Sequence, residues 1–214
     1  MTKQEQIEAI ISKSCDDNGY ALSEVDIAVI TLDLLKSGLI AFENKMTVDE
    51  VGQGEVFKWG EKEYIKLDTI SIHDGCLCLA KDAWFNSKFD DKTNNWEHSE
   101  LRSGMIEEVK DFIPNFYKLR SFDRDLTTDD GLTDYGHCSD SVSMLTCDEY
   151  RKYRKYIPET SECYWTITAH TFGSYYVRFV IPDGALNYSD THSSYRMVRP
   201  LICLDKDTLV EVEE

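Results

Sequence analysis

The stretch from Cys163 to Cys203 decides the fold of this chain, and it reads CYWTITAHTFGSYYVRFVIPDGALNYSDTHSSYRMVRPLIC. Glycine, proline, serine and aspartate separate three apolar runs in it: Tyr164–Thr168, Tyr175–Ile181 and Val198–Leu204. Short aromatic and β-branched runs bounded by turn residues are typical of strands. The stretch therefore predicts three strands, with a loop from Asn187 to Arg196, and we expect Trp165 and the last run to be buried in one sheet.

More strands are predicted ahead of this stretch. Glu55–Trp59 and Glu63–Leu67 flank a Gly-Glu-Lys turn, which is a hairpin signal, and a third strand is expected over Cys76–Ala80. In that third strand Cys76 and Cys78 alternate and would share one face.

Two helices are predicted between these strands and the C-terminal stretch. Ser99 is placed to cap a helix that ends before Pro114, with apolar residues Leu101, Met105, Ile106 and Val109. Thr146 and Glu149 have the spacing of a capping box, so Asp148–Tyr156 is expected to be helical. Basic side chains crowd this helix and are expected to pair with the protein's own acids; they are Arg151, Lys152, Arg154 and Lys155.

The N-terminal residues predict a pair of helices. An apolar stripe over residues 2–17 indicates the first helix, and Ser23 can cap a second helix that runs to Lys36. The second helix is apolar all round, so the main domain or a second copy of the chain must cover it. A helix-turn-helix is an alternative, but this helix carries no cluster of lysine and arginine for phosphate contacts. The predicted organisation is a helical appendage over 1–45, a linker over 46–55, one domain over 56–204 and an acidic tail over 205–214.

Composition limits the classes of function. The chain has 214 residues, is 42% hydrophobic, and carries a formal net charge of −17. A field of this sign repels nucleic acid and anionic membranes and attracts basic proteins, although acidic surfaces also serve solubility alone. No apolar run is long enough to span a membrane and the first residues are polar, so the sequence predicts a cytoplasmic protein with neither direct DNA binding nor membrane binding.

The cysteines and the acidic loop residues offer two places for a metal. The seven cysteines form no C-x-x-C pair and the five histidines are scattered, so the cysteines are expected to be core residues in a reducing compartment. One loop is dense in carboxylates: Asp123, Asp125, Asp129, Asp130 and Asp134. The spacing of these aspartates is not that of an EF-hand, so a turn-rich loop is favoured over a calcium site. No nucleophile elbow, P-loop or dinucleotide glycine motif is present, so we predict no catalytic residue, metal or cofactor.

Four ordered motifs carry a resemblance to a known family. They are the WTIT, VRFVIPDG and MVRPLICL segments of the C-terminal stretch, Trp96-Glu97-His98-Ser99-Glu100-Leu101-Arg102, the loop from Arg124 to Gly136, and the segment from Val142 to Arg154. From about Gly54 to Leu204 the chain resembles a domain family of unknown function that is common in bacteria and their phages. The resemblance implies the C-type-lectin-like architecture, which formylglycine-generating enzymes and phage receptor-binding variable proteins also use, and a phage-linked setting, but no reaction. The family usually has W-W-x-x-T-P-W where this chain has YWTITAH, so the loop that would meet a ligand is altered.

The fold class expected from the motifs and patterns together is α+β: a C-type-lectin-like domain with a mixed or antiparallel sheet and two helices, plus the N-terminal helical pair. The predicted function is a non-catalytic, phage-derived accessory factor that binds a basic, nucleic-acid-handling host protein, in the manner of an anti-CRISPR inhibitor. The alternative is a lectin-like module that binds a small ligand or glycan. A homodimer through the N-terminal helices is also left open.

Two sets of residues are candidates for binding. The lectin-like hypothesis uses the C-terminal loops, where tyrosine, histidine and arginine provide contact area at low entropic cost; these residues are His170, Phe172, Tyr175, Tyr188, Asp190, His192, Tyr195 and Arg196. The acidic hypothesis uses the five aspartates of the loop from Asp123 to Asp134.

Overall fold

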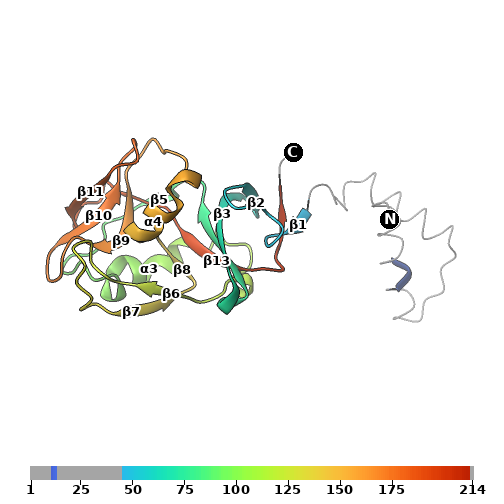
Figure 1. Ribbon diagram of the computed structural model, residues 1–214, viewed down its shortest axis with the longest axis horizontal. Coiled ribbons are helices and arrows are strands. Elements are labelled where there is room, and N and C mark those ends of the chain that lie inside the picture. The colour runs from blue at the N-terminus through green and yellow to red at the C-terminus, as the bar shows by residue number, and fades with distance from the viewer. Residues whose placement is uncertain (1–10, 14–44, 213–214) are drawn as a thin grey trace. The chain divides into compact units, whose positions relative to one another are not determined.

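The computed structural model describes residues 11–13 and 45–212, and the chain divides into two compact units, Met1–Lys45 and Met46–Glu214 (Figure 1). Apart from a helical segment at 11–13, the predicted N-terminal helical pair lies outside the described residues. The second unit is a mixed α+β structure whose sheets are mostly antiparallel. No helix among the described residues has the length and apolar character needed to cross a bilayer.

The larger sheet has seven strands in the order β1-β14-β2-β3-β4-β13-β8. Their bounds are β1 Lys45–Thr47, β2 Val56–Trp59, β3 Lys62–Ile70, β4 Gly75–Ala80, β8 Val142–Ser143, β13 Leu201–Asp205 and β14 Leu209–Glu211. β2 and β3 form the predicted hairpin, and Gly60 at its turn has a φ of 67°, a value that glycine adopts without strain. β4 begins one residue before the expected strand, and both of its faces are buried.

The smaller sheet has five strands in the order β11-β10-β9-β12-β5. Their bounds are β5 Phe85–Asn86, β9 Tyr164–Ala169, β10 Tyr176–Val180, β11 Leu186–Asp190 and β12 Met197–Val198. The predicted loop from Asn187 to Arg196 is therefore wrong in its first part, where β11 pairs with β10 without a bulge. No residue of this polar edge strand is buried, so it lacks the apolar pattern that marks the other strands.

The last apolar run is buried as predicted, but it is divided between the two sheets. Val198 belongs to β12, which runs parallel to β9, whereas Leu201 begins β13 in the seven-stranded sheet. Between them lies Pro200, which has no N–H to donate to a ladder. Beside it the buried Arg199 donates from Nε to the Ala80 carbonyl at 2.8 Å and from Nη2 to that of Lys81 at 2.7 Å, which fixes the crossing point.

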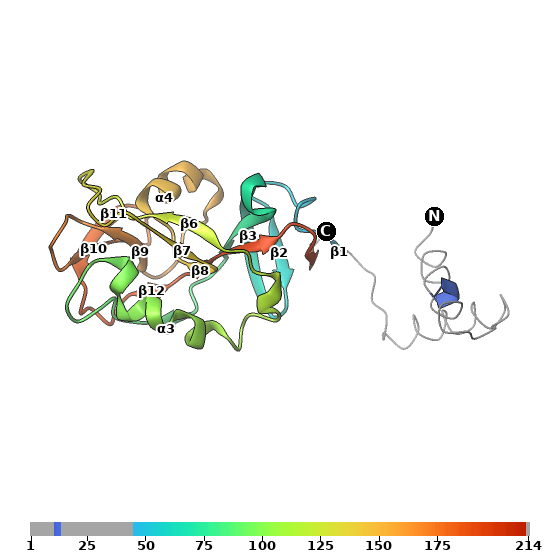
Figure 2. The same ribbon diagram turned by 90° about the horizontal axis from the view of Figure 1, so that it is seen from below.

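Capping residues set the helices. α3 spans Glu100–Val109, and the Ser99 hydroxyl accepts from the Arg102 N–H at 3.1 Å. α4 spans Cys147–Tyr153 and has the predicted Thr146–Glu149 capping box. Figures 1 and 2 show α3 and α4 on opposite sides of β9. The remaining elements are the strands β6 Phe122–Asp125 and β7 His137–Asp140, which pair with each other, and the 3₁₀ helices η1 Ser71–His73, η2 Trp96–His98, η3 Phe116–Lys118 and η4 Arg154–Tyr156.

Two hydrophobic clusters lie on the two faces of β4. Cys76 and Cys78 join the cluster that also holds Trp165, whereas Leu77 and Leu79 join the cluster beneath α4. Ile106, expected on the apolar side of α3, is 45% exposed, because α3 turns only Leu101, Met105 and Val109 into the core.

Two predicted segment boundaries need correction. The expected linker over 46–55 contains part of β1 and two core residues, Val48 and Val51. The expected acidic tail over 205–214 contains β14, which pairs with β2 and buries Val210. Both segments are mostly polar, but the buried Val48, Val51 and Val210 anchor them to the domain.

Several motif residues behind the family resemblance form buried polar contacts. Trp96 Nε1 and Arg102 Nε both donate to the Asp140 carboxylate, each at 2.8 Å. Arg124 donates to both carboxylate oxygens of Glu149 at 2.6 Å. These contacts tie β7 to α3 and β6 to α4, so the motif residues that make them have structural roles.

Candidate functional site

The five-stranded sheet has one face in the core and one face that is only partly covered. Trp165 and Phe179 point into the core, whereas alternate residues of β9, β10 and β11 lie on the other face. α4 covers part of that second face, where the Cys147 N–H donates to Thr168 Oγ1 at 2.9 Å. Beyond α4 lies a group that we call the tyrosine face, consisting of His170, Tyr176, Arg178 and Tyr188.

Ring contacts hold the tyrosine face together. The His170 and Tyr188 rings are stacked, with centroids 4.5 Å apart and an interplanar angle of 2°. Tyr176 meets Tyr188 edge-on at 5.5 Å, and the Arg178 guanidinium lies 5.5 Å from the Tyr188 ring centre. Tyr176 is 44% exposed and Tyr188 is 49% exposed. The face therefore presents aromatic surface whose side chains are already held in place, which lowers the entropy lost on binding.

Asp129 closes the side of the tyrosine face that adjoins α4. Its carboxylate accepts from Arg151 of α4 at 2.8 Å and from Arg178 of β10. Burial alone would raise the pKa of Asp129, but the hydrogen bond from Arg151 and the charge of Arg178 outweigh burial and lower that pKa. A cavity of about 170 Å³ opens beside this bridge, lined by Asp129, Arg151 and Thr168 among others.

This bridge makes a prediction about stability and pH. Asp129→Asn is expected to lower the free energy of unfolding at pH 7 by about 2 kcal/mol, because two arginines lose a charged acceptor. The folded pKa of Asp129 is depressed, so its contribution is present above the unfolded pKa of about 3.9 and is lost as pH falls through the folded value. Urea unfolding of both proteins from pH 7 to pH 2 should show their difference shrinking at the acid end. A constant difference would contradict this.

Two polar atoms of the tyrosine face are buried without a protein partner. They are His170 Nδ1 and Arg178 Nε. Buried polar groups are usually paired with protein or water. Seven further side-chain atoms among the described residues are in the same state, so it does not by itself single out the tyrosine face. The Arg178 guanidinium donates from Nη2 to Asp129 and lies beside the Tyr188 ring, while its Nε is buried.

At β11, the outer edge of the five-stranded sheet, a side chain caps one backbone N–H group. Just beyond the ends of β10 and β11, the Thr191 N–H donates to the Tyr175 carbonyl and the Ile181 N–H donates to the Ala185 carbonyl. Continued through the register, this pattern turns the N–H groups of the odd-numbered β11 residues toward β10 and the Tyr188 N–H outward. The Asn187 side chain accepts from that N–H at 2.8 Å. This cap removes one of the backbone donors that an added strand would need at β11.

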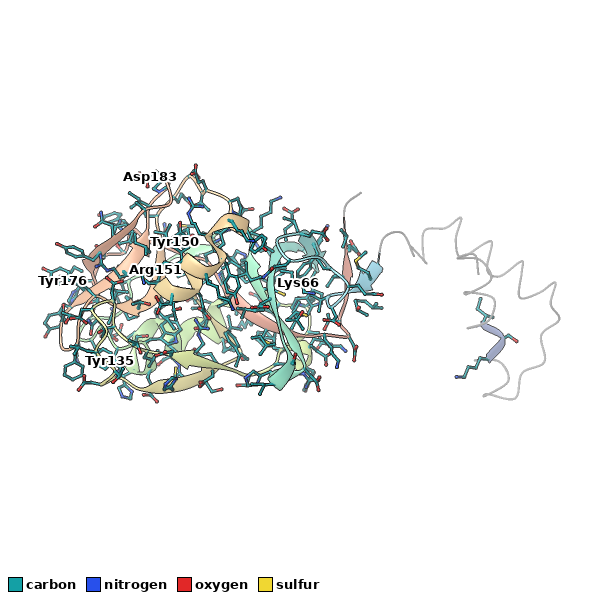
Figure 3. The ribbon with its side chains drawn as sticks, viewed as in Figure 1. Lys66, Tyr135, Tyr150, Arg151, Tyr176 and Asp183 are labelled. Atoms are coloured by element: carbon teal, nitrogen blue, oxygen red, sulfur yellow. The ribbon has the colours of Figure 1, made fainter. Side chains whose placement is uncertain are left out.

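The other aromatic candidates occupy neighbouring but separate positions. Phe172 packs against Tyr135, with ring centres 4.9 Å apart, and the Tyr135 hydroxyl donates to Asn94, whose amide also reaches the Tyr176 carbonyl. Figure 3 places Tyr135 and Tyr176 at the same end of the second unit. Tyr195 is 84% exposed.

The remaining binding candidates lie on the last loop or beside it, and the structure places them in two separate groups. The rings of Tyr175 and His192 lie 6.2 Å apart, and the Asp190 carboxylate pairs with His192 at 2.5 Å. The hydrogen bond with Asp190 raises the pKa of His192 above its ordinary value. Arg196 lies over the Phe179 ring at 4.1 Å, so the structure does not bring it to the tyrosine face.

The aspartate-rich loop is held by its own contacts. Asp125 accepts from Thr127, Asp130 accepts from Thr128 and Thr171, and Asp123 lies 3.5 Å from His137. Asp134 is exposed. Within residues 11–13 and 45–212, no three histidine, cysteine or acidic side chains gather in a way that could hold a metal. Three of the four basic residues of α4 and η4 pair with acids as predicted: Arg151 with Asp129 and Asp148, Lys152 with Asp68, and Arg154 with Glu159. The Lys155 ammonium instead lies 4.4 Å from the Tyr156 ring centre.

The thiol beside the cavity is inert. Burial raises the pKa of Cys147 to about 11, so it stays protonated at neutral pH and is a poor nucleophile.

Sequence reasoning missed two members of the tyrosine face, Tyr176 and Arg178. A signal for Arg178 was present, because it alternates with Val177 and Phe179 in a strand and so had to lie on the opposite face from the core. Its contact with Asp129, 49 residues away, has no signal in the sequence.

No family model, curated protein or solved structure matches this chain.

Proposed function

We propose that this protein is a non-catalytic binding protein that holds a protein partner through the tyrosine face. The observation that carries the proposal is the half-exposed, pre-ordered group of Tyr176, Tyr188 and His170, braced by Arg178 and Asp129. Tyrosine and arginine are the residue types that dominate binding energy at protein interfaces.

The proposed partner is a basic, nucleic-acid-handling protein. The formal net charge of −17 favours association with a basic surface and disfavours nucleic acid itself. In this proposal the domain has the C-type-lectin-like architecture, with its N-terminal helical pair as an appendage, and the setting is a phage factor that inhibits a host defence protein in the host cytoplasm. The family resemblance of the four motifs supports that setting.

The test compares matched tyrosine variants against a purified partner. Tyr176→Ala with Tyr188→Ala should weaken binding by about a hundredfold or more, because truncating a buried tyrosine anchor typically costs ~2 kcal/mol. Tyr117→Ala is the control, since Tyr117 is 94% exposed in η3 and away from the tyrosine face. Calorimetry at low and high salt should also show weaker binding at high salt, because screening shortens the reach of surface charge.

Two results would count against the proposal. Equal affinity of the double variant and the control would remove the tyrosine face from the interface. Saturable binding of a free glycan, abolished by the same double variant, would instead support the lectin-like alternative, for which the stacked His170–Tyr188 rings are a suitable platform.

A further inference from the structure

A second surface lies on the far side of α4 from the tyrosine face, in a groove of about 500 Å³ between the β3–β4 connection and α4. We call it the β3–α4 groove. Apolar side chains from β3, η1 and β4 line one side of it, namely Ile70, Ile72 and Leu77. Ionisable side chains line the other side, most of them from α4 and one, Asp68, from β3.

At the end of the apolar side, the Ile72 side chain is open to solvent. Ile72 is 91% exposed, and no residue of η1 is buried. Leu77 at the base is only 3% exposed. The other residues of this short connection are polar, so nothing on it covers the isoleucine. The side chain would contribute hydrophobic free energy only if another molecule covered it.

The charged side is predominantly acidic. Three carboxylates and one ammonium line the groove: Asp68, Asp148, Glu149 and Lys152. Glu149 is committed to Arg124, and Asp68 accepts from Lys152 at 2.9 Å and from the Tyr153 hydroxyl at 2.6 Å. Asp148 pairs with Arg151 through Oδ1, but its side chain is 84% exposed and its other oxygen can accept from a partner.

We infer that the β3–α4 groove binds a basic segment of a partner protein, in which an apolar side chain packs on Ile72 and a neighbouring lysine or arginine pairs with Asp148. Charge complementarity selects this occupant over a second copy of the chain, which would bring another −17 charges to the contact. The inference does not depend on the tyrosine face, because the two surfaces share no residue.

A short peptide of alternating lysine and leucine is the probe, titrated into the full chain while the methyl groups of Ile70, Ile72 and Leu77 are followed by NMR. We expect saturable shifts at these methyls. Ile72→Ser with Asp148→Asn should weaken binding by about tenfold or more, the loss typical of an anchor contact. Both side chains are exposed, so this variant should stay folded, and its melting temperature should fall by no more than the loss of one surface ion pair allows.

Controls separate the groove from general charge attraction. Leu209→Ser with Glu107→Gln removes an apolar group that is 61% exposed and a carboxylate that is 76% exposed elsewhere, and should leave affinity unchanged. Replacing every leucine of the peptide with serine should abolish the methyl shifts. Tyr176→Ala with Tyr188→Ala should have no effect, which separates this test from that of the tyrosine face. Equal weakening by both groove and control variants, equal binding of the serine peptide, or no methyl shifts would overturn the inference.

Discussion

Glu149→Gln is expected to lower the free energy of unfolding by about 3–5 kcal/mol, because it leaves a buried arginine without its counter-charge. The Arg124 side chain is 1% exposed, and it donates to both Glu149 oxygens and to the Met144 carbonyl at 2.7 Å. Glutamine keeps the length of the side chain and its oxygen can still accept from the Thr146 N–H at the start of α4, so the loss combines the charge with the hydrogen bond from Arg124 Nη1. Urea unfolding at pH 7 measures it.

The matched control is Glu107→Gln. The Glu107 carboxylate is exposed, so its replacement should change the free energy of unfolding by less than about 0.5 kcal/mol. Adding Arg124→Met to Glu149→Gln should recover much of the loss, because the double variant no longer buries an unpaired charge. A loss below about 1 kcal/mol for Glu149→Gln, or no recovery in the double variant, would show that this ion pair does not hold β6 to α4.

Trp165→Ala is expected to cost about 3–5 kcal/mol, the range for removing a large aromatic side chain from a packed core. Trp165 is fully buried in β9, its indole N–H donates to the Ser87 carbonyl at 2.9 Å, and its ring meets Phe89 and Phe179. The loss therefore combines a cavity with an unpaired carbonyl. Thermal unfolding of Trp165→Ala measures the loss, with Tyr117→Ala as a control that should be nearly neutral. Similar melting temperatures for the two variants would contradict the placement of Trp165 in the core.

Local chemistry explains which parts of the fold could be predicted. Ser99 and Thr146 mark the starts of α3 and α4 because a side-chain cap is encoded within four residues. The β2–β3 hairpin and β4 follow from a glycine turn and from apolar runs. In each case the signal lies within the element itself.

The errors arise where an element depends on distant neighbours. β11 exists because β10 supplies its hydrogen bonds, and its own polar sequence does not predict a strand. Val48 and Val210 anchor segments that composition alone marked as linker and tail. The tyrosine face needed the register of β10 against β11, which sets Arg178 opposite Tyr188, and the long-range contact with Asp129.

The candidate site was predicted in part. His170 and Tyr188 were chosen for their residue types, and the structure stacks their rings. Asp129 was chosen as an acidic contact, whereas its carboxylate braces Arg151 and Arg178. A residue type indicates what a side chain can do, but only the fold decides whether it faces a partner or another part of the chain.

Photo-crosslinking from single positions tests the central claim most directly. A photoreactive phenylalanine analogue replaces Tyr176, Tyr188 or, as the control, Tyr117, and the crosslinked proteins are identified by mass spectrometry after expression in bacterial cells. The account predicts that positions 176 and 188 capture the same basic, nucleic-acid-handling protein and that position 117 does not. Capture of that protein from position 117 alone, or of unrelated proteins from positions 176 and 188, would contradict it.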